Sequence, residues 1–200
     1  MSSGCRRGPR TKDGQILWQH DQSWDTRNLA WEPDQSLQTG DAWEHTRGIG
    51  FSFGYNQIED KTTTLSGPAL VRHFVDVVAR GGNLLINVGL TAPGEIPPLQ
   101  RTALDALGAW NATYGHAVFG SRPGGPAMTS LRWHRWTRAD GRAHLFLEPG
   151  DPLDVNLLPG QVVVDSAVDA HGRPLAPNAG TLPVLDDPHG VSLMSFDLRA

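Results

Sequence analysis

The chain has 200 residues and a formal net charge of −4, and 38% of its residues are hydrophobic, as in an ordinary globular protein. This slightly acidic composition argues against a nucleic-acid partner, and no apolar run approaches the roughly 20 residues that span a bilayer. The single cysteine, Cys5, excludes a disulfide within the chain, and no CxxC pair or His-x-Glu cluster points to a metal site. We therefore expect no nucleic acid, membrane or metal to be bound.

The first segment offers little to bury. Residues 1–14 hold Ser, Gly, Pro, Arg and Lys, so we expect them to be disordered, and a short strand is predicted at 16–18. The segment lacks the apolar core of a signal peptide, so the sequence indicates the cytoplasm only by default.

Residues 18–42 mix tryptophan with Asp, Glu and Gln. Flat aromatic rings can stack on the apolar face of a pyranose while carboxylates hold its hydroxyl groups, so this composition suits a sugar site. Trp31 and Glu32 are the candidate residues within it. The same composition also fits a surface loop with several half-buried tryptophans, and composition alone leaves both interpretations open.

A strand is predicted to begin at Trp43. Glu44 beside it is interpreted as a buried structural partner of an arginine or of backbone amides, in preference to a catalyst. Gly48 and Gly50 permit an irregular strand end. A polar loop then leads to the next helix.

That helix has clear boundaries in the sequence. Ser66 can cap it, Pro68 lies in its first turn, and Gly81 and Gly82 stop it. Its apolar residues recur at spacings of three and four, which is typical of a helix that covers a sheet; they are Leu70, Val71, Phe74, Val75 and Val78.

A short apolar strand is predicted at 84–88, bounded by glycines. Asn83 and Asn87 share one face of it. They either form hydrogen bonds with neighbouring strands, or Asn87 borders a site at the carboxyl end of the strand. The alternation of strand, loop and helix favours a parallel α/β domain.

A last helix is predicted from Pro97–Pro98 to about residue 113, ended by Gly115. Glu95 before it receives no chemical role. A Gly/Pro-rich linker at 121–125 divides the chain into domains at 15–120 and 126–200.

The second domain is predicted to be a small antiparallel β-sandwich. A hairpin turns at Asp140–Gly141, and Trp133 and Trp136 are interpreted as packing residues. Further strands are predicted at 162–164, 182–185 and 191–198.

Several motifs in fixed order resemble the last part of the catalytic barrel of family-29 α-L-fucosidases. They are Trp43-Glu44, Arg47-Gly-Ile-Gly50, Phe53-Gly-Tyr-Asn56, the run from Asp76 to Gly89, Gly94-Glu-Ile-Pro-Pro98, Leu107-Gly-Ala-Trp110 and the run from Tyr114 to Gly120. The resemblance implies an α/β plus all-β fold: the C-terminal part of a (β/α)8-type barrel followed by a small antiparallel β-sandwich. Since a whole barrel needs about 250 residues, we expect a truncated chain.

The resemblance also implies a retaining glycoside hydrolase that acts on terminal α-L-fucose of glycoconjugates without a cofactor. Phe53 matches a phenylalanine that lies against the methyl side of the sugar; a core role is the alternative. The family's acid/base glutamate aligns near Leu29 or Ala30, which cannot transfer a proton, so the nearest glutamate, Glu32, is the candidate, with Trp31 as a second sugar-binding residue. The family's nucleophile, an aspartate on an earlier strand, has no counterpart in this chain.

Two further expectations follow from the truncation. The rival function is a non-catalytic fragment or a carbohydrate-binding accessory protein. A half barrel exposes strand edges, so self-association through those edges is also expected. The abrupt mismatch of the first 40 residues would fit the loss or frameshift of an upstream coding segment.

Overall fold

The structure is a computed structural model that describes residues 7–10, 16–21, 43–50, 52–124, 133–150, 152–183 and 185–199. The first half contains β1 (Arg7–Arg10), β2 (Ile16–Asp21), β3 (Trp43–Gly48), α1 (Gly67–Ala79), β4 (Gly82–Asn87), α2 (Pro98–Tyr114) and the 3-10 helix η2 (Gly115–Ala117). The second half contains β5 (Arg122–Pro123), β6 (His134–Ala139), β7 (Arg142–Leu147), β8 (Leu153–Asp154), η3 (Val155–Leu157), η4 (Val164–Ser166), β9 (Val168–Asp169), β10 (Thr181–Leu182) and β11 (Ser192–Asp197).

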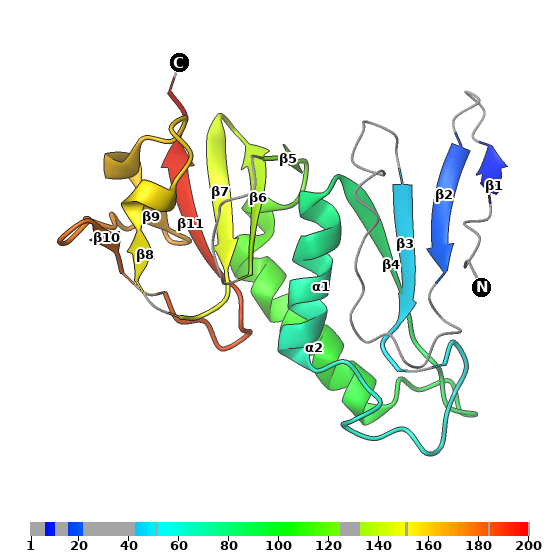
Figure 1. The fold of residues 1–200 in the computed structure, drawn as a ribbon. Helices are drawn as coiled ribbons and strands as arrows, with labels where there is room; N and C mark the ends of the chain where they lie inside the picture. Colours follow the sequence, from blue (N-terminus) through cyan, green and yellow to red (C-terminus); the bar gives the residue numbers. More distant parts are fainter. Residues whose placement is uncertain are drawn as a thin grey trace, which may run out of the picture.

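The two helices lie between two sheets (Figure 1). The first sheet has the order β1-β2-β3-β4, with β3 parallel to both of its neighbours and β1 antiparallel to β2. The second is antiparallel, with the order β5-β6-β7-β11-β9, and β8 pairs separately with β10. One apolar cluster joins the helices to the second sheet; it includes Val71, Val75, Trp110, Phe146 and Leu193. The fold is therefore α/β in its first half and antiparallel β in its second.

Helix α1 begins and ends as its sequence predicts. Ser66 accepts a hydrogen bond from the backbone N–H of Ala69 at 3.3 Å, and the helix ends at Ala79. Gly81 follows with a φ of +81°, which glycine adopts without steric cost. Asp76 pairs with Arg80, four residues further along the chain, at 3.4 Å.

Side chains on the parallel strands divide between two faces. His45 of β3, which pairs with β4, lies on the side of the sheet that faces the helices, because its ring centroid is 4.9 Å from that of His73 on α1. Since side chains alternate along a strand, Glu44 and Thr46 lie on the other side of the sheet. Leu85 of β4 is paired with Thr46 and lies on that side too. Leu85 is half exposed there.

Within the stretch 1–14, which the sequence predicts to be disordered, the structure describes residues 7–10. These four residues form β1, in irregular register with β2. An edge strand can form through backbone N–H and C=O groups alone, so the lack of apolar side chains does not prevent it.

Two strand predictions in the second half are too long. In the predicted strand 162–164, Val162 makes an isolated bridge to Leu198, and Val164 already begins η4. In the predicted strand 182–185, the strand ends at Leu182. The first predicted strand gives way to the 3-10 helix η4, and the second ends before Pro183, which has no backbone N–H to donate to a neighbouring strand.

The hairpin is confirmed, with β6 and β7 paired in full around Asp140 and Gly141. Both turn residues have positive φ, 52° and 75°. Within the predicted linker 121–125, Arg122 and Pro123 add β5 to the edge of β6. None of the described helices is long and apolar enough to cross a membrane.

Candidate functional site

The candidate site lies at the carboxyl ends of β3 and β4. Two loops leave the sheet there, one of residues 49–65 and one of residues 88–97. Parallel strands end at the same edge, and loops at that edge carry the active sites of α/β barrels. The backbone N–H of Ile49 donates to the carbonyl of Asn87 at 3.1 Å, so the two loops begin side by side.

Phe53 is held through its backbone. The side-chain amide of Asn87, the last residue of β4, donates to the carbonyl of Phe53 at 2.7 Å. Phe53 is 37% exposed, which is high for a large apolar residue. Asn87 therefore bonds to the loop that follows β3, in place of the predicted neighbouring strand, and its amide holds the backbone at Phe53.

The two loops touch at a pair of glycines. A Cβ atom on Gly89 would lie 2.5 Å from the carbonyl oxygen of Gly54 and 2.9 Å from the backbone nitrogen of Tyr55. Real Cβ atoms do not approach backbone so closely, so only glycine fits at position 89 without a shift. This contact sets the spacing between the loops.

A buried polar network fastens both loops to α2. Gln100, which is 2% exposed, accepts from the backbone N–H of Gly89 at 3.0 Å. Its amide nitrogen donates to both carboxylate oxygens of Glu59, at 2.8 and 3.1 Å. Thr64 donates to Glu59 at 3.0 Å. No role for Gln100 or Glu59 was predicted from the sequence. One feature of the sequence could have indicated Gln100: it is a polar residue on the buried face of the helix, three positions before Ala103.

Of the predicted site residues, the structure describes Phe53 alone. It lies in the loop that follows β3, and its contact with a sugar stays a prediction. Trp31 and Glu32 lie outside the described residues, so their roles stay predictions. Glu95 is exposed, and its backbone N–H donates to Thr91 Oγ1 at 3.1 Å, as in a loop before a helix.

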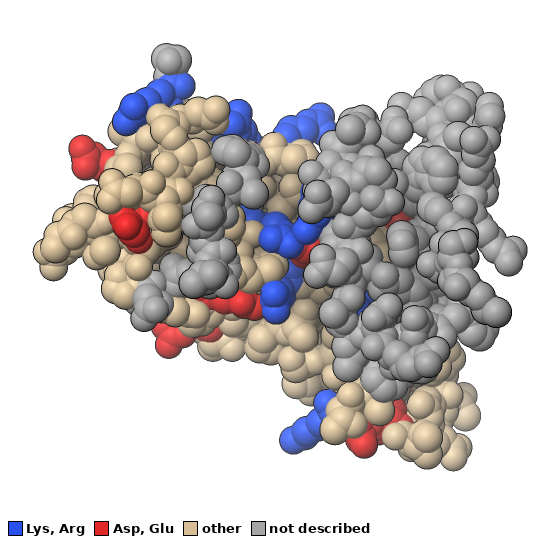
Figure 2. Space-filling model, in the orientation of Figure 1, with Lys and Arg blue, Asp and Glu red and all other residues tan. Residues whose placement is uncertain are grey.

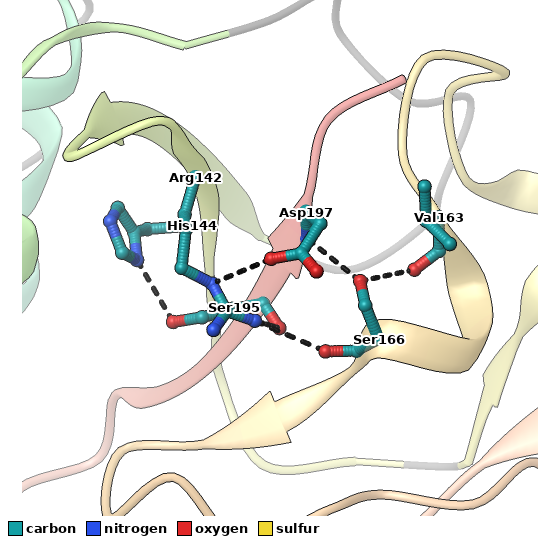
Figure 3. Close-up of polar contacts among 6 residues, drawn as sticks. All are labelled: Arg142, His144, Val163, Ser166, Ser195 and Asp197. Atoms are coloured by element: carbon teal, nitrogen blue, oxygen red, sulfur yellow. Dashed lines mark hydrogen bonds and ion pairs between the residues drawn. The ribbon is translucent and has the colours of Figure 1, made fainter. Parts of the chain in front are cut away.

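A serine–histidine pair in the second sheet is structural (Figure 3). His144 Nδ1 and Ser195 Oγ are 2.9 Å apart, on the neighbouring strands β7 and β11. Both residues are buried, 3% and 4% exposed, which excludes a substrate from the pair. Burial lowers the pKa of His144 to about 4, so the ring is neutral at pH 7. Beside them, Arg142 donates to the carbonyls of Ser166 and Ser195 and pairs with Asp197.

Charged side chains of both signs lie on the described surface. Over the described residues, no group of three or more His, Cys, Asp or Glu side chains could hold a metal ion. On the face drawn in Figure 2, positive and negative side chains lie side by side.

This chain is similar to α-L-fucosidases in both sequence and structure. The sequence model of the Alpha-L-fucosidase family matches residues 13–116, just over half of the chain. The α-L-fucosidase of Dictyostelium discoideum is 32% identical over 106 residues, which are 52% of this chain and 23% of that protein. The human tissue α-L-fucosidase is 33% identical over 82 residues, which are 40% of this chain and 18% of that protein.

The structural comparison agrees. The Thermotoga maritima α-fucosidase in complex with fucose is similar with a TM-score of 0.63 at 30% identity, over 78% of this chain and 40% of that chain. The chain thus spans about a fifth of the curated relatives and two fifths of that solved structure. The match lies over the segment that carries the loops of the candidate site, and this chain belongs to the α-L-fucosidase family.

Proposed function

We propose that the chain forms the C-terminal part of the (β/α)8-type barrel of a retaining α-L-fucosidase that acts on terminal α-L-fucose of glycoconjugates. The observation that carries this proposal is the placement of Phe53. It lies at the carboxyl edge of a parallel sheet, with its backbone held by Asn87 and its ring exposed. An apolar ring fixed in this way suits the methyl-bearing side of fucose.

The reaction requires two carboxyl groups about 5–5.5 Å apart, one as nucleophile and one as acid/base. We assign the acid/base role to Glu32 and sugar contacts to Phe53 and Trp31. The two carboxylates of the loop that carries Phe53 are otherwise engaged: Glu59 accepts from Gln100, and Asp60 accepts from Thr62 and Thr63. The nucleophile is not in this chain, and no cofactor is needed.

Hydrolysis of a chromogenic α-L-fucoside by the full chain tests the assignment. We expect no turnover by the chain alone, and turnover once a segment that supplies the nucleophile is added. In the active assembly, Glu32→Ala should lower kcat by at least about a hundredfold, as loss of a general acid/base does. Asp25→Ala, in the same stretch, is the matched control. Turnover by the isolated chain that survives active-site titration would contradict the missing nucleophile, and full activity of Glu32→Ala would contradict its role.

A second candidate function is sugar binding without cleavage. The hydrogen bonds of Glu59 and Asp60 favour this function. Both carboxylates accept hydrogen bonds within the protein, so the loop that carries Phe53 offers an aromatic ring to a sugar and no available carboxylate. A chain that binds L-fucose as a folded monomer, and gains no turnover from any added segment, would support this function over the first.

We also propose self-association through the edge of the parallel sheet. Among the described strands, β4 pairs with β3 alone, and Leu85 in its middle is 50% exposed. An exposed edge can pair with another strand. Sedimentation velocity should show a concentration-dependent dimer that Leu85→Lys weakens. Ile58→Lys, at an 83% exposed position outside the sheet, should leave the dimer intact. A monomer at all concentrations would contradict the proposal.

A further inference from the structure

Two large side chains beside Phe53 are strongly exposed. Tyr55 is 47% exposed and Leu90 is 49% exposed. They belong to different loops, the first following β3 and the second following β4. Scattered apolar side chains on a surface are ordinary, but two on adjoining loops at a candidate site suggest a contact surface.

The backbones of these two residues are neighbours. Gly89 approaches Gly54 and the backbone nitrogen of Tyr55 so closely that a Cβ atom would clash, and Leu90 follows Gly89 directly. Gln100 holds the N–H of Gly89, which fixes the second loop. Tyr55 and Leu90 are therefore exposed residues on adjoining stretches of backbone that are held in place.

The pair also adjoins the proposed sugar position. Tyr55 is two residues beyond Phe53, whose carbonyl is held by Asn87 at 2.7 Å. A glycoside bound against Phe53 must direct its second half, the aglycone, toward neighbouring loops. Leucine offers no hydrogen bond and tyrosine offers mainly a ring face, so this surface favours a flat apolar group over a hydroxylated one.

We propose that Tyr55 and Leu90 form an aglycone lip that binds the apolar leaving group of an α-L-fucoside. The inference rests on the proposed function, because Phe53 places the sugar. It adds a substrate preference, for fucosides with an aromatic or other apolar aglycone. Burying a phenyl group against the lip should tighten binding about tenfold relative to a methyl group.

The test compares two ligands that resist hydrolysis, phenyl and methyl 1-thio-α-L-fucoside. Their dissociation constants for the full chain are measured by saturation-transfer NMR titration. We expect phenyl to bind about tenfold tighter than methyl, and the ratio to fall to about two in Tyr55→Ser and in Leu90→Ser. Methyl thiofucoside should bind all three proteins alike, and circular dichroism checks that each is folded.

Ile58→Ser is the matched control, because Ile58 is an 83% exposed apolar residue of the same loop. It should keep the full ratio. Equal affinity of the unchanged chain for the two ligands overturns the aglycone lip and leaves the proposed fucoside site standing. The same conclusion follows if Tyr55→Ser and Leu90→Ser both keep the full affinity ratio. It also follows if Ile58→Ser lowers the ratio as much as they do. If neither thiofucoside binds, the proposed function fails, and the aglycone lip fails with it.

Discussion

Phe53 combines a backbone that is held in place with an exposed residue surface. Its carbonyl accepts from Asn87, while the residue is 37% exposed. The backbone bond orders the loop before a ligand arrives, so less conformational entropy is lost on binding. The exposed ring contributes little to folding and is available for recognition.

Phe53→Ser should therefore weaken L-fucose binding about tenfold, since an aromatic contact is worth about 1–1.5 kcal/mol. The free energy of unfolding should change by less than about 0.5 kcal/mol, as for other exposed positions. Titration of L-fucose followed by NMR and urea unfolding measure the two quantities. Strong destabilisation with unchanged binding would instead show that Phe53 is a core residue.

Gly89 is a residue whose role depends on its distance from another loop. Gly89→Ala would place a Cβ atom 2.5 Å from the carbonyl oxygen of Gly54, so the loops must separate. We expect a loss of about 1–3 kcal/mol in the free energy of unfolding, measured in urea. Gly108→Ala is the matched control, because nothing lies within 4 Å of its Cβ position in α2, and it should stabilise by about 0.5–1 kcal/mol. A stable Gly89→Ala protein would show that the loops are not held in contact.

At the scale of elements, a buried carboxylate joins α1 to the second sheet. Asp76 is 6% exposed and pairs with Arg135 of β6 as well as with Arg80 of its own helix. The guanidinium carbons of Arg135 and Arg72 each lie 5.3 Å from the ring centroid of Trp133. Burial lowers the pKa of Arg135, and Asp76 counteracts that effect. The helix is thus fixed to the sheet by charge as well as by apolar contact.

A double-mutant cycle can separate the two arginines. Asp76→Ala should cost about 2–4 kcal/mol of unfolding free energy, because it leaves Arg135 partly buried without its carboxylate. Coupling of Asp76 with Arg135 should exceed coupling with Arg80, which lies at 3.4 Å within the same helix. Guanidinium unfolding of the single and double variants gives both couplings. Equal coupling energies would show that the ion pair of Asp76 with Arg135 of β6 stabilises the fold no more than its pair with Arg80 does.

For the whole molecule, two buried histidines set the response to acid. Burial is the main cause that lowers the pKa of His73 from 6.5 to about 3 and that of His144 to about 4. The unfolded chain binds these protons from about pH 6.5 downward and the folded chain does not. Stability is therefore full above pH 6.5 and falls as the pH drops toward 4.

Each neutral histidine adds up to about 1.4 kcal/mol per pH unit to this decline. Urea unfolding between pH 7 and pH 4.5 measures how steeply the free energy of unfolding falls with pH. This range lies above 3.8, the ordinary pKa of aspartate. His144→Gln should flatten the slope, while His171→Gln, at an exposed position, should not. An unchanged slope in His144→Gln would show that this ring is protonated in the folded state.

The sequence by itself determined the elements whose signals are local. Ser66 and Gly81 bound α1, Asp140 and Gly141 turn the hairpin, and the ordered motifs led to the family. These signals act between residues that are close along the chain, so a pattern of spacing reveals them.

Only the tertiary structure decided the contacts that hold the site. Gln100 and Glu59 are 41 residues apart, Asp76 and Arg135 are 59 apart, and β1 depends on the backbone of its neighbour. No local propensity encodes such pairs, because a polar residue near an apolar stripe looks the same whether its partner is water or a distant carboxylate. The packing of α2 against the loops is what brings Gln100 to Gly89 and so fixes the edge where Phe53 lies.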